Sequence, residues 1–179
     1  MSSIQPNIER EIAFDRYMLN VRALLLDFQY IEESLKILIA GSYEAIRRSA
    51  PAMIYFRPSR SSLEKDSLGK LIQKYESISR NDPLIRALRT VLADRNFCAH
   101  RSYLLSIEEQ EDIKFLEAES QRMEVIRILT KDCLKVLSNE LQVIAAHLNE
   151  SSVNLAERDA PQAPTDEVDN LPPPCASSS

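Results

Sequence analysis

Apolar residues in the first part of the chain follow the period of an α-helix. Between about Ile8 and Arg48 they recur at alternating spacings of three and four residues, which places them on one stripe of a helix. The stripe consists of Val21, Leu24, Phe28, Ile31, Leu35 and Leu38. Gly41 is expected to end or bend this helix, because glycine costs about 1 kcal/mol relative to alanine in a helix interior. Pro51 should stop it.

Each of the next two predicted helices has a start signal. Ser61 and Glu64 have the spacing of a capping box, in which each side chain satisfies a free backbone N–H at a helix start. Further along, Asp82 suits an N-cap, and Pro83 suits the first helical position, where its missing N–H is not needed. A second helix is therefore expected after Ser61, and a third is expected to run from Pro83 into residues 94–103.

The last helical pattern opens with another capping-box spacing, Ser106 and Glu109, and continues to about Leu148. Prolines, acids and serines then replace the apolar residues. Such a segment cannot bury enough apolar surface to offset its chain entropy, so residues 150–179 are expected to form a disordered tail. The predicted fold is all-α: an antiparallel four-helix bundle in residues 1–149, followed by this acidic C-terminal tail.

Net charge is confined to the predicted tail. The chain of 179 residues has a net charge of −5, and the segment from Glu150 onward, with six acids and one base, accounts for all of it. The first 149 residues are therefore neutral overall. Strong nonspecific binding to nucleic acid is not expected from such a body.

Cysteine usage and motifs exclude several classes of protein. Cys98, Cys133 and Cys175 are widely spaced and form no C-x-x-C pair, so they are interpreted as reduced thiols. No Gly-rich phosphate loop or paired-carboxylate site is visible, so no cofactor and no metal is expected. The N-terminus has no basic region followed by an apolar run, and the apolar runs are too short to span a bilayer. We therefore expect a cytoplasmic protein without a membrane partner.

The sequence DRNFCAHRSY, residues 94–103, places an arginine in the predicted buried face of the third helix. At about 100° per residue, Arg95 falls in the centre of this face, while Asn96 and His100 lie one turn apart on its flank. The apolar members of the face are Leu84, Leu88, Val91, Leu92, Cys98 and Ala99. A guanidinium is always charged, and burying it unpaired would cost many kcal/mol.

Three arrangements of Arg95 are open at this point. It would pair with a carboxylate, for which Glu32 and Glu33 are candidates; it would reach solvent at the end of the bundle; or the face would open into a cleft or a subunit interface. The first two arrangements describe a plain structural bundle. The third describes a functional site.

The side chains in this segment suit phosphate chemistry. Histidine is the side chain best able to exchange protons near neutral pH, and an arginine beside it can hold a phosphate and stabilise developing charge. In RNA cleavage without metal, His100 would take the proton of the ribose 2′-OH or give one to the leaving 5′-oxygen. Arg95 would stabilise the phosphorane, and Asn96 would orient the histidine or the phosphate.

The segment R-N-F-C-A-H, from Arg95 to His100, resembles the R-x4-6-H signature of the HEPN superfamily (higher eukaryotes and prokaryotes nucleotide-binding domains). Asn96 agrees with the polar residue that often follows the arginine there, and residues 63–76 look like the second helix of such families. The resemblance implies a metal-independent endoribonuclease of a toxin or defence system. It also implies a homodimer in which two signatures face each other and form one composite active site.

Further expectations follow from the resemblance. Arg101 and Tyr103 would bind the RNA substrate, and an antitoxin or another defence protein would be a partner. In HEPN toxins silenced by a nucleotidyltransferase antitoxin a tyrosine follows the histidine as H-x-Y, whereas here the sequence is H-R-S-Y, so modification of Tyr103 by that route is not expected. Other members lack catalysis, and the alternative function is therefore a noncatalytic helical module that binds a nucleotide, RNA or protein.

Overall fold

Six α-helices make up the part of the chain that the structure describes. The computed structural model describes residues 5–51, 60–102 and 104–158, and no strand occurs among them. The helices are α1 (Gln5–Ser49), α2 (Arg60–Glu64), α3 (Leu68–Ile78), α4 (Asp82–Arg101), α5 (Ile107–Glu111) and α6 (Ile113–Arg158). The predicted all-α fold class is confirmed for these residues. None of the described helices combines the length and the apolar composition needed to cross a membrane.

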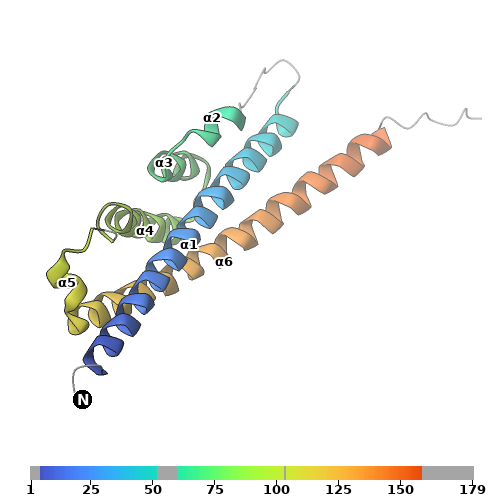
Figure 1. Ribbon diagram of the computed structural model, residues 1–179. Helices are drawn as coiled ribbons and strands as arrows, with labels where there is room; N and C mark the ends of the chain where they lie inside the picture. Colours follow the sequence, from blue (N-terminus) through green and yellow to red (C-terminus); the bar gives the residue numbers. More distant parts are fainter. Residues whose placement is uncertain (1–4, 52–59, 103, 159–179) are drawn as a thin grey trace, which may run out of the picture.

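The two long helices, α1 with 45 residues and α6 with 46, lie side by side and run in the same direction (Figure 1). Three hydrogen-bonded pairs demonstrate this, because in each pair the α6 residue lies 100 positions after its α1 partner. These pairs are Asn20 with Ser120, Asp27 with Arg127, and Arg48 with Leu148. Only parallel helices keep such an offset constant along their length.

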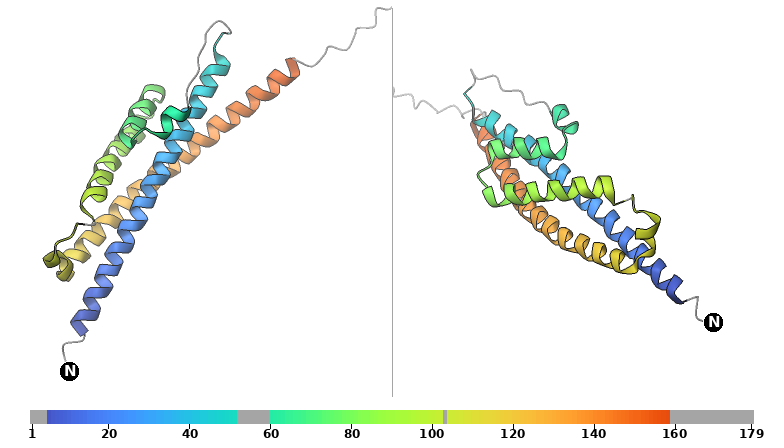
Figure 2. Two further views of the ribbon diagram at one scale, coloured as in Figure 1. Left: turned by 45° about the horizontal axis from the view of Figure 1, so that its top comes forward. Right: turned by 90° about the vertical axis from the view of Figure 1, so that its left-hand side faces the viewer.

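A hairpin of α3 and α4 lies obliquely across one side of the α1–α6 pair (Figure 2). Its two helices run in opposite directions, since Arg89 of α4 forms an ion pair with Glu76 of α3 at 2.8 Å, and Leu92 lies beside Gly69. The described helices thus form two layers, one of long helices and one of short helices.

The direction of α4 differs from that of α6. Ahead of α4, Asn81 Nδ2 donates to Glu140 Oε1 at 2.7 Å, whereas near the end of α4 the sulfur of Cys98 lies 3.7 Å from that of Met123. The arrangement therefore differs from the predicted antiparallel four-helix bundle: α3, α4 and α6 alternate in direction, but the first and last helices are parallel. Hydrophobic periodicity shows which face of each helix is buried, but it does not determine the direction of its neighbours.

Two of the predicted helices are each divided into a short and a longer piece. α2 begins at Arg60 and ends at Glu64, and α3 begins only at Leu68, so the predicted second helix is interrupted. The predicted capping box of Ser61 and Glu64 depends on the side chain of Ser61, which lies outside the described residues. Asp66, between the two helices, accepts a hydrogen bond from Lys74 Nζ at 2.6 Å. The hydrogen bond thus ties the segment between α2 and α3 to Lys74 of α3.

The start signal before the last helix behaves differently. The predicted capping box of Ser106 and Glu109 is confirmed, but it opens the short α5. Asp112 then opens α6, because its Oδ1 accepts hydrogen bonds from the backbone N–H groups of Lys114 and Phe115 at 3.0 and 3.2 Å. α6 continues to Arg158, past the predicted boundary between residues 149 and 150. Residues 159–179 of the predicted tail lie outside the described residues.

The core is centred on the predicted stripe of α1. All six of its members, from Val21 to Leu38, are at most 2% exposed. Gly41 does not end α1, which continues to Ser49, so this part of the prediction is wrong. A Cβ atom at this position would lie 2.9 Å from Ile144 Cγ2, so the glycine permits a close approach of α1 and α6.

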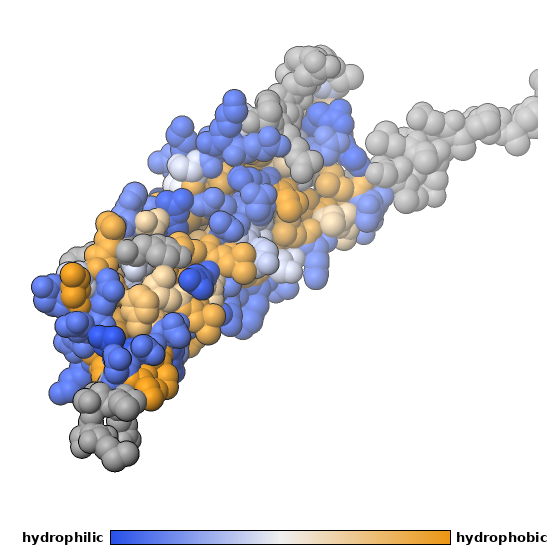
Figure 3. All heavy atoms as spheres, in the orientation of Figure 1, coloured by the Kyte–Doolittle hydropathy of each residue, from blue (hydrophilic) through white to orange (hydrophobic). Residues whose placement is uncertain are grey.

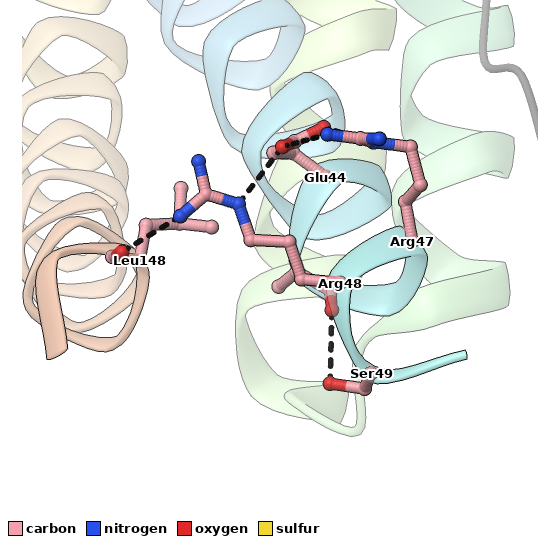
Figure 4. A network of polar contacts seen from close by, with 6 residues as sticks. Glu44, Arg47, Arg48, Ser49 and Leu148 are labelled. Carbon is pink, nitrogen blue, oxygen red and sulfur yellow. Dashed lines mark hydrogen bonds and ion pairs between the residues drawn. The ribbon is translucent and has the colours of Figure 1, made fainter. Parts of the chain in front are cut away.

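A polar network joins the C-terminal end of α1 to α6 (Figure 4). Glu44 accepts hydrogen bonds from Arg47 and Arg48, and these guanidinium groups lower its pKa to about 2. Arg48 also donates from Nη1 to the backbone carbonyl of Leu148 at 2.9 Å. The network therefore holds the far ends of the two long helices together.

Candidate functional site

α4 carries the candidate site, and both its start and its inner face are firmly held. Asn81 is the N-cap, one residue earlier than predicted, and its Oδ1 accepts a hydrogen bond from the backbone N–H of Leu84 at 3.2 Å. The inner face is completely or almost completely buried at Leu84, Leu88, Val91 and Cys98. These contacts fix the orientation of the outer face, on which the candidate residues lie.

Arg95 lies at the edge of the inner face and not in its centre. Its side chain is 37% exposed, and its Nη2 lies 3.6 Å from Glu32 Oε1. The predicted buried face is wrong in its last two turns, because Ala99 is exposed and Leu92 is only half-buried. There α4 packs through Cys98 towards α6, and the side that bears Arg95 turns towards solvent.

Of the three arrangements open for Arg95, the structure shows pairing with a carboxylate. The partner is Glu32, whose side chain is 22% exposed, while Glu33 forms an ion pair with Lys36 at 2.6 Å. Ion pairs between partly exposed groups contribute only about 0–1 kcal/mol to stability. The ion pair therefore orients the guanidinium of Arg95 but contributes little to the stability of the fold.

Asn96 and His100 lie on the outer face of α4, and both are exposed. Asn96 links the outer face to Arg95, because its Oδ1 accepts a long hydrogen bond of 3.5 Å from Arg95 Nη1. Arg86, Arg89 and Ala93 precede Asn96 and His100 at alternating spacings of three and four, and all of them are exposed. The outer face of α4 is thus an exposed strip that carries two of the predicted site residues, Asn96 and His100.

The two predicted substrate-binding residues are only partly described. Arg101 is the last residue of α4, and its side chain lies outside the described residues, as does all of Tyr103. Their roles stay predictions. Backbone position alone places Arg101 next to His100 at the C-terminal end of the strip.

A small cavity beside this end of α4 was not foreseen from the sequence. It has a volume of about 150 Å³, and its walls include Tyr17 of α1, Phe97 of α4 and Arg122 of α6. The guanidinium of Arg122 lies 4.2 Å from the centre of the Phe97 ring, a cation–π contact. One signal for this cavity is present in the sequence: Tyr17 lies four residues before Val21 and so continues the buried stripe of α1.

Tyr17 attaches the end of α4 to α1. Its hydroxyl donates to the backbone carbonyl of Ser102 at 2.9 Å, and burial raises its pKa to about 12. Cys98, on the adjacent turn, is fully buried, and burial raises the pKa of its thiol. The expectation that Cys98 is a core residue is confirmed, and a buried thiol of raised pKa is a poor nucleophile.

Possible ligands for a metal are dispersed. Within the described ranges, no three His, Cys, Asp or Glu side chains lie close enough together to hold an ion. The described candidate residues therefore offer a guanidinium, an amide and an imidazole on one helix. Comparisons with models of known protein families, with curated proteins and with solved structures find no match for this chain.

Proposed function

We propose that this chain is a metal-independent endoribonuclease of a toxin or defence system, as its resemblance to the HEPN superfamily implies. The observation that carries the proposal is the grouping of Arg95, Asn96 and His100 at the accessible end of one helix in an all-α fold. Two of these side chains are exposed, and the third is oriented by Glu32 and Asn96. Phosphate chemistry of this kind requires an accessible histidine and a guanidinium that can reach the same phosphate.

The reaction would proceed by internal transfer on the RNA. His100 takes the proton of the ribose 2′-OH, the 2′-oxygen attacks phosphorus, and the bond to the 5′-oxygen breaks. The products are a 2′,3′-cyclic phosphate and a 5′-hydroxyl, and the 5′-oxygen must receive a proton. Arg95 would neutralise the charge on the phosphorane, and Asn96 would hold a phosphate oxygen or the imidazole.

A second copy of the signature would complete the site. One histidine cannot accept the first proton and donate the second at the same moment, whereas two facing copies would supply a base and an acid. The exposure of the outer face of α4 also supports this arrangement, because a single copy would contact a phosphate from one side only. RNA would then lie between two α4 helices of a homodimer, and a partner protein such as an antitoxin would act by covering this surface.

The second candidate function is a noncatalytic module that binds a nucleotide, RNA or a protein. The ion pair of Arg95 with Glu32 favours the protein-binding form of this module, since a carboxylate that competes with a phosphate for the guanidinium weakens nucleotide and RNA binding as well as cleavage. Such a module would use the same strip of α4 but would have no need of the imidazole of His100.

RNA cleavage by the purified full chain in EDTA tests the proposal. We expect cleavage by wild type and by the matched control Arg86→Ala, which removes an exposed arginine from the same face two turns before the signature. We expect loss of cleavage in His100→Ala and Arg95→Ala, with circular dichroism unchanged. An absence of cleavage by wild type on varied RNAs, with RNA still bound, would favour the binding module. Equal loss in Arg86→Ala would indicate a general charge effect and not a catalytic site.

A further inference from the structure

α1 carries a second apolar stripe that is exposed. Its members are separated by four or seven residues, so they lie within about 40° of one another around the helix. They are 47% to 66% exposed and consist of Ile8, Ile12, Leu19, Leu26, Tyr30 and Ile37. We call this set the outer stripe. α1 is therefore apolar on two opposite sides, of which only one is covered by the described chain.

The outer stripe lies on the side of α1 away from α4. α4 contacts the inner side of α1, through Tyr17 with Ser102 and through Glu32 with Arg95. Figure 3, which views the molecule from the side on which α1 lies in front, shows apolar surface distributed along that face. From Ile8 to Ile37 the stripe is about 44 Å long. Monomers rarely expose continuous apolar patches of more than a few hundred Å², and larger ones mark interaction sites.

Segments of the same chain do not suit the outer stripe. Residues 52–59 span at most about 28 Å even when fully extended, which is shorter than the stripe. Residues 159–179 are long enough, but Val168 and Leu171 are their only large aliphatic residues, and they contain four acids and no base. The covering molecule must therefore provide a long apolar surface with a helical repeat, which the outer stripe itself has.

We propose that a second copy of this chain covers the outer stripe, with the two α1 helices antiparallel about a two-fold axis at Leu19. The spacings between the five members from Ile8 to Tyr30 are four, seven, seven and four, and they read the same in both directions. An axis at Leu19 consequently opposes Leu19 to its own copy, Ile12 to Leu26, and Ile8 to Tyr30. A self-complementary order of this kind is what a two-fold interface requires.

Charges beside the stripe agree with the same axis. Asp15 and Arg22 are exposed, lie on the same flank of the stripe, and form no ion pair with the described residues. Asp15 lies four residues before Leu19 and Arg22 three residues after it, so the two-fold axis brings Asp15 of each copy to Arg22 of the other. Two ion pairs at the rim would fix the antiparallel register.

This interface is independent of RNA cleavage. It uses the side of α1 opposite α4, so it leaves both α4 strips uncovered, and the composite site proposed above would need a different contact. The two contacts can therefore be tested separately. A standard interface buries about 800 Å² on each partner, and the outer stripe with its polar borders offers a continuous surface over most of α1.

Sedimentation of the full chain over a concentration series tests the proposal. We expect wild type to associate through the outer stripe, whether or not it also associates through α4. The dissociation constant of this contact should rise at least about tenfold in Leu19→Glu, since a charge is placed at the centre of the interface. The matched control is Ile128→Glu on α6, where the native side chain is 63% exposed, close to the 66% of Leu19. This control should associate as wild type does, and both variants should keep the circular dichroism of wild type.

Exchange of the rim charges tests the register. Asp15→Arg and Arg22→Asp should each weaken the dimer, and the double variant should recover it. In a Cys175→Ser background, Leu19→Cys should form an intermolecular disulfide across the axis, and Ile37→Cys should not. A monomeric wild type at tens of micromolar would overturn the proposal. So would an assembly that keeps both its size and its dissociation constant in Leu19→Glu. A dimer that is broken only by variants on α4 would overturn it in favour of the composite-site contact.

Discussion

α1 and α4 both pack against other helices, but they differ in how much of their buried face is covered. Neighbouring helices flank most of this face in α1, but only its first half in α4. α1 has α6 on one flank and the α3–α4 hairpin on the other, and its inner stripe is buried from Val21 to Leu38. α4 is covered in this way only in its first half. Its last two turns keep Cys98 buried but expose Ala99 and leave the side chain of Arg95 37% exposed. Apolar residues of the same helical period thus lie in the core along α1, but at the edge of the core at the end of α4.

The largest difference between the two helices should appear in their response to truncation. Leu24→Ala in the inner stripe of α1 should lower the free energy of unfolding by about 2–5 kcal/mol, because it removes a fully buried side chain and leaves a cavity. Ala99→Ser on the exposed turn of α4 should change it by no more than about 0.5 kcal/mol. Urea denaturation of both variants measures this, and a similar loss in both would mean that the end of α4 is core as well.

The attachment of the end of α4 to α1 should have an intermediate effect. Tyr17→Phe removes the hydroxyl that donates to the carbonyl of Ser102 and leaves that acceptor without its partner. We expect a loss of about 1 kcal/mol in the free energy of unfolding. Hydrogen exchange should locate faster opening at the end of α4 and not along α1. Faster exchange throughout α1 would contradict this view of a locally attached helix end.

The two glycines of the chain allow a matched comparison of crowding. Gly41→Ala should destabilise the fold by about 1 kcal/mol. The new Cβ would lie 2.9 Å from Ile144 Cγ2, and the cost of this close contact should exceed the gain in helix propensity. Gly69→Ala places its Cβ 3.5 Å from Leu92, an ordinary contact, and should stabilise by about 0.5 kcal/mol. Thermal melts of the two variants should therefore shift in opposite directions. Equal shifts would show that the approach of α1 to α6 is not limited by Gly41.

Much of the fold could be predicted from the sequence because helical periodicity and caps are local signals. The inner stripe of α1 and the capping box of Ser106 and Glu109 are examples. The parallel direction of α1 and α6 could not, since it depends on contacts between residues 100 positions apart. The role of Gly41 was missed for the same reason, because propensity alone ignores the neighbouring helix.

The sequence could name candidate site residues, but it could not predict how exposed Arg95 is. The helical wheel placed Arg95 in the centre of a uniform face, although the neighbours of α4 change along its length. Its pairing with Glu32 was among the arrangements that the charge of the guanidinium required. The cavity at Tyr17 and Arg122 is lined by residues of four helices, and no local pattern in the sequence connects them.

Cleavage of RNA by Arg95→Ala in EDTA, measured beside its free energy of unfolding, tests the central claim most directly. The pair with Glu32 is partly exposed, so we predict that cleavage is lost while stability falls by less than about 1 kcal/mol. A fall of about 3–5 kcal/mol, as expected for a broken buried ion pair, would contradict the account and make Arg95 a structural residue. Undiminished cleavage by the folded variant would contradict it as well.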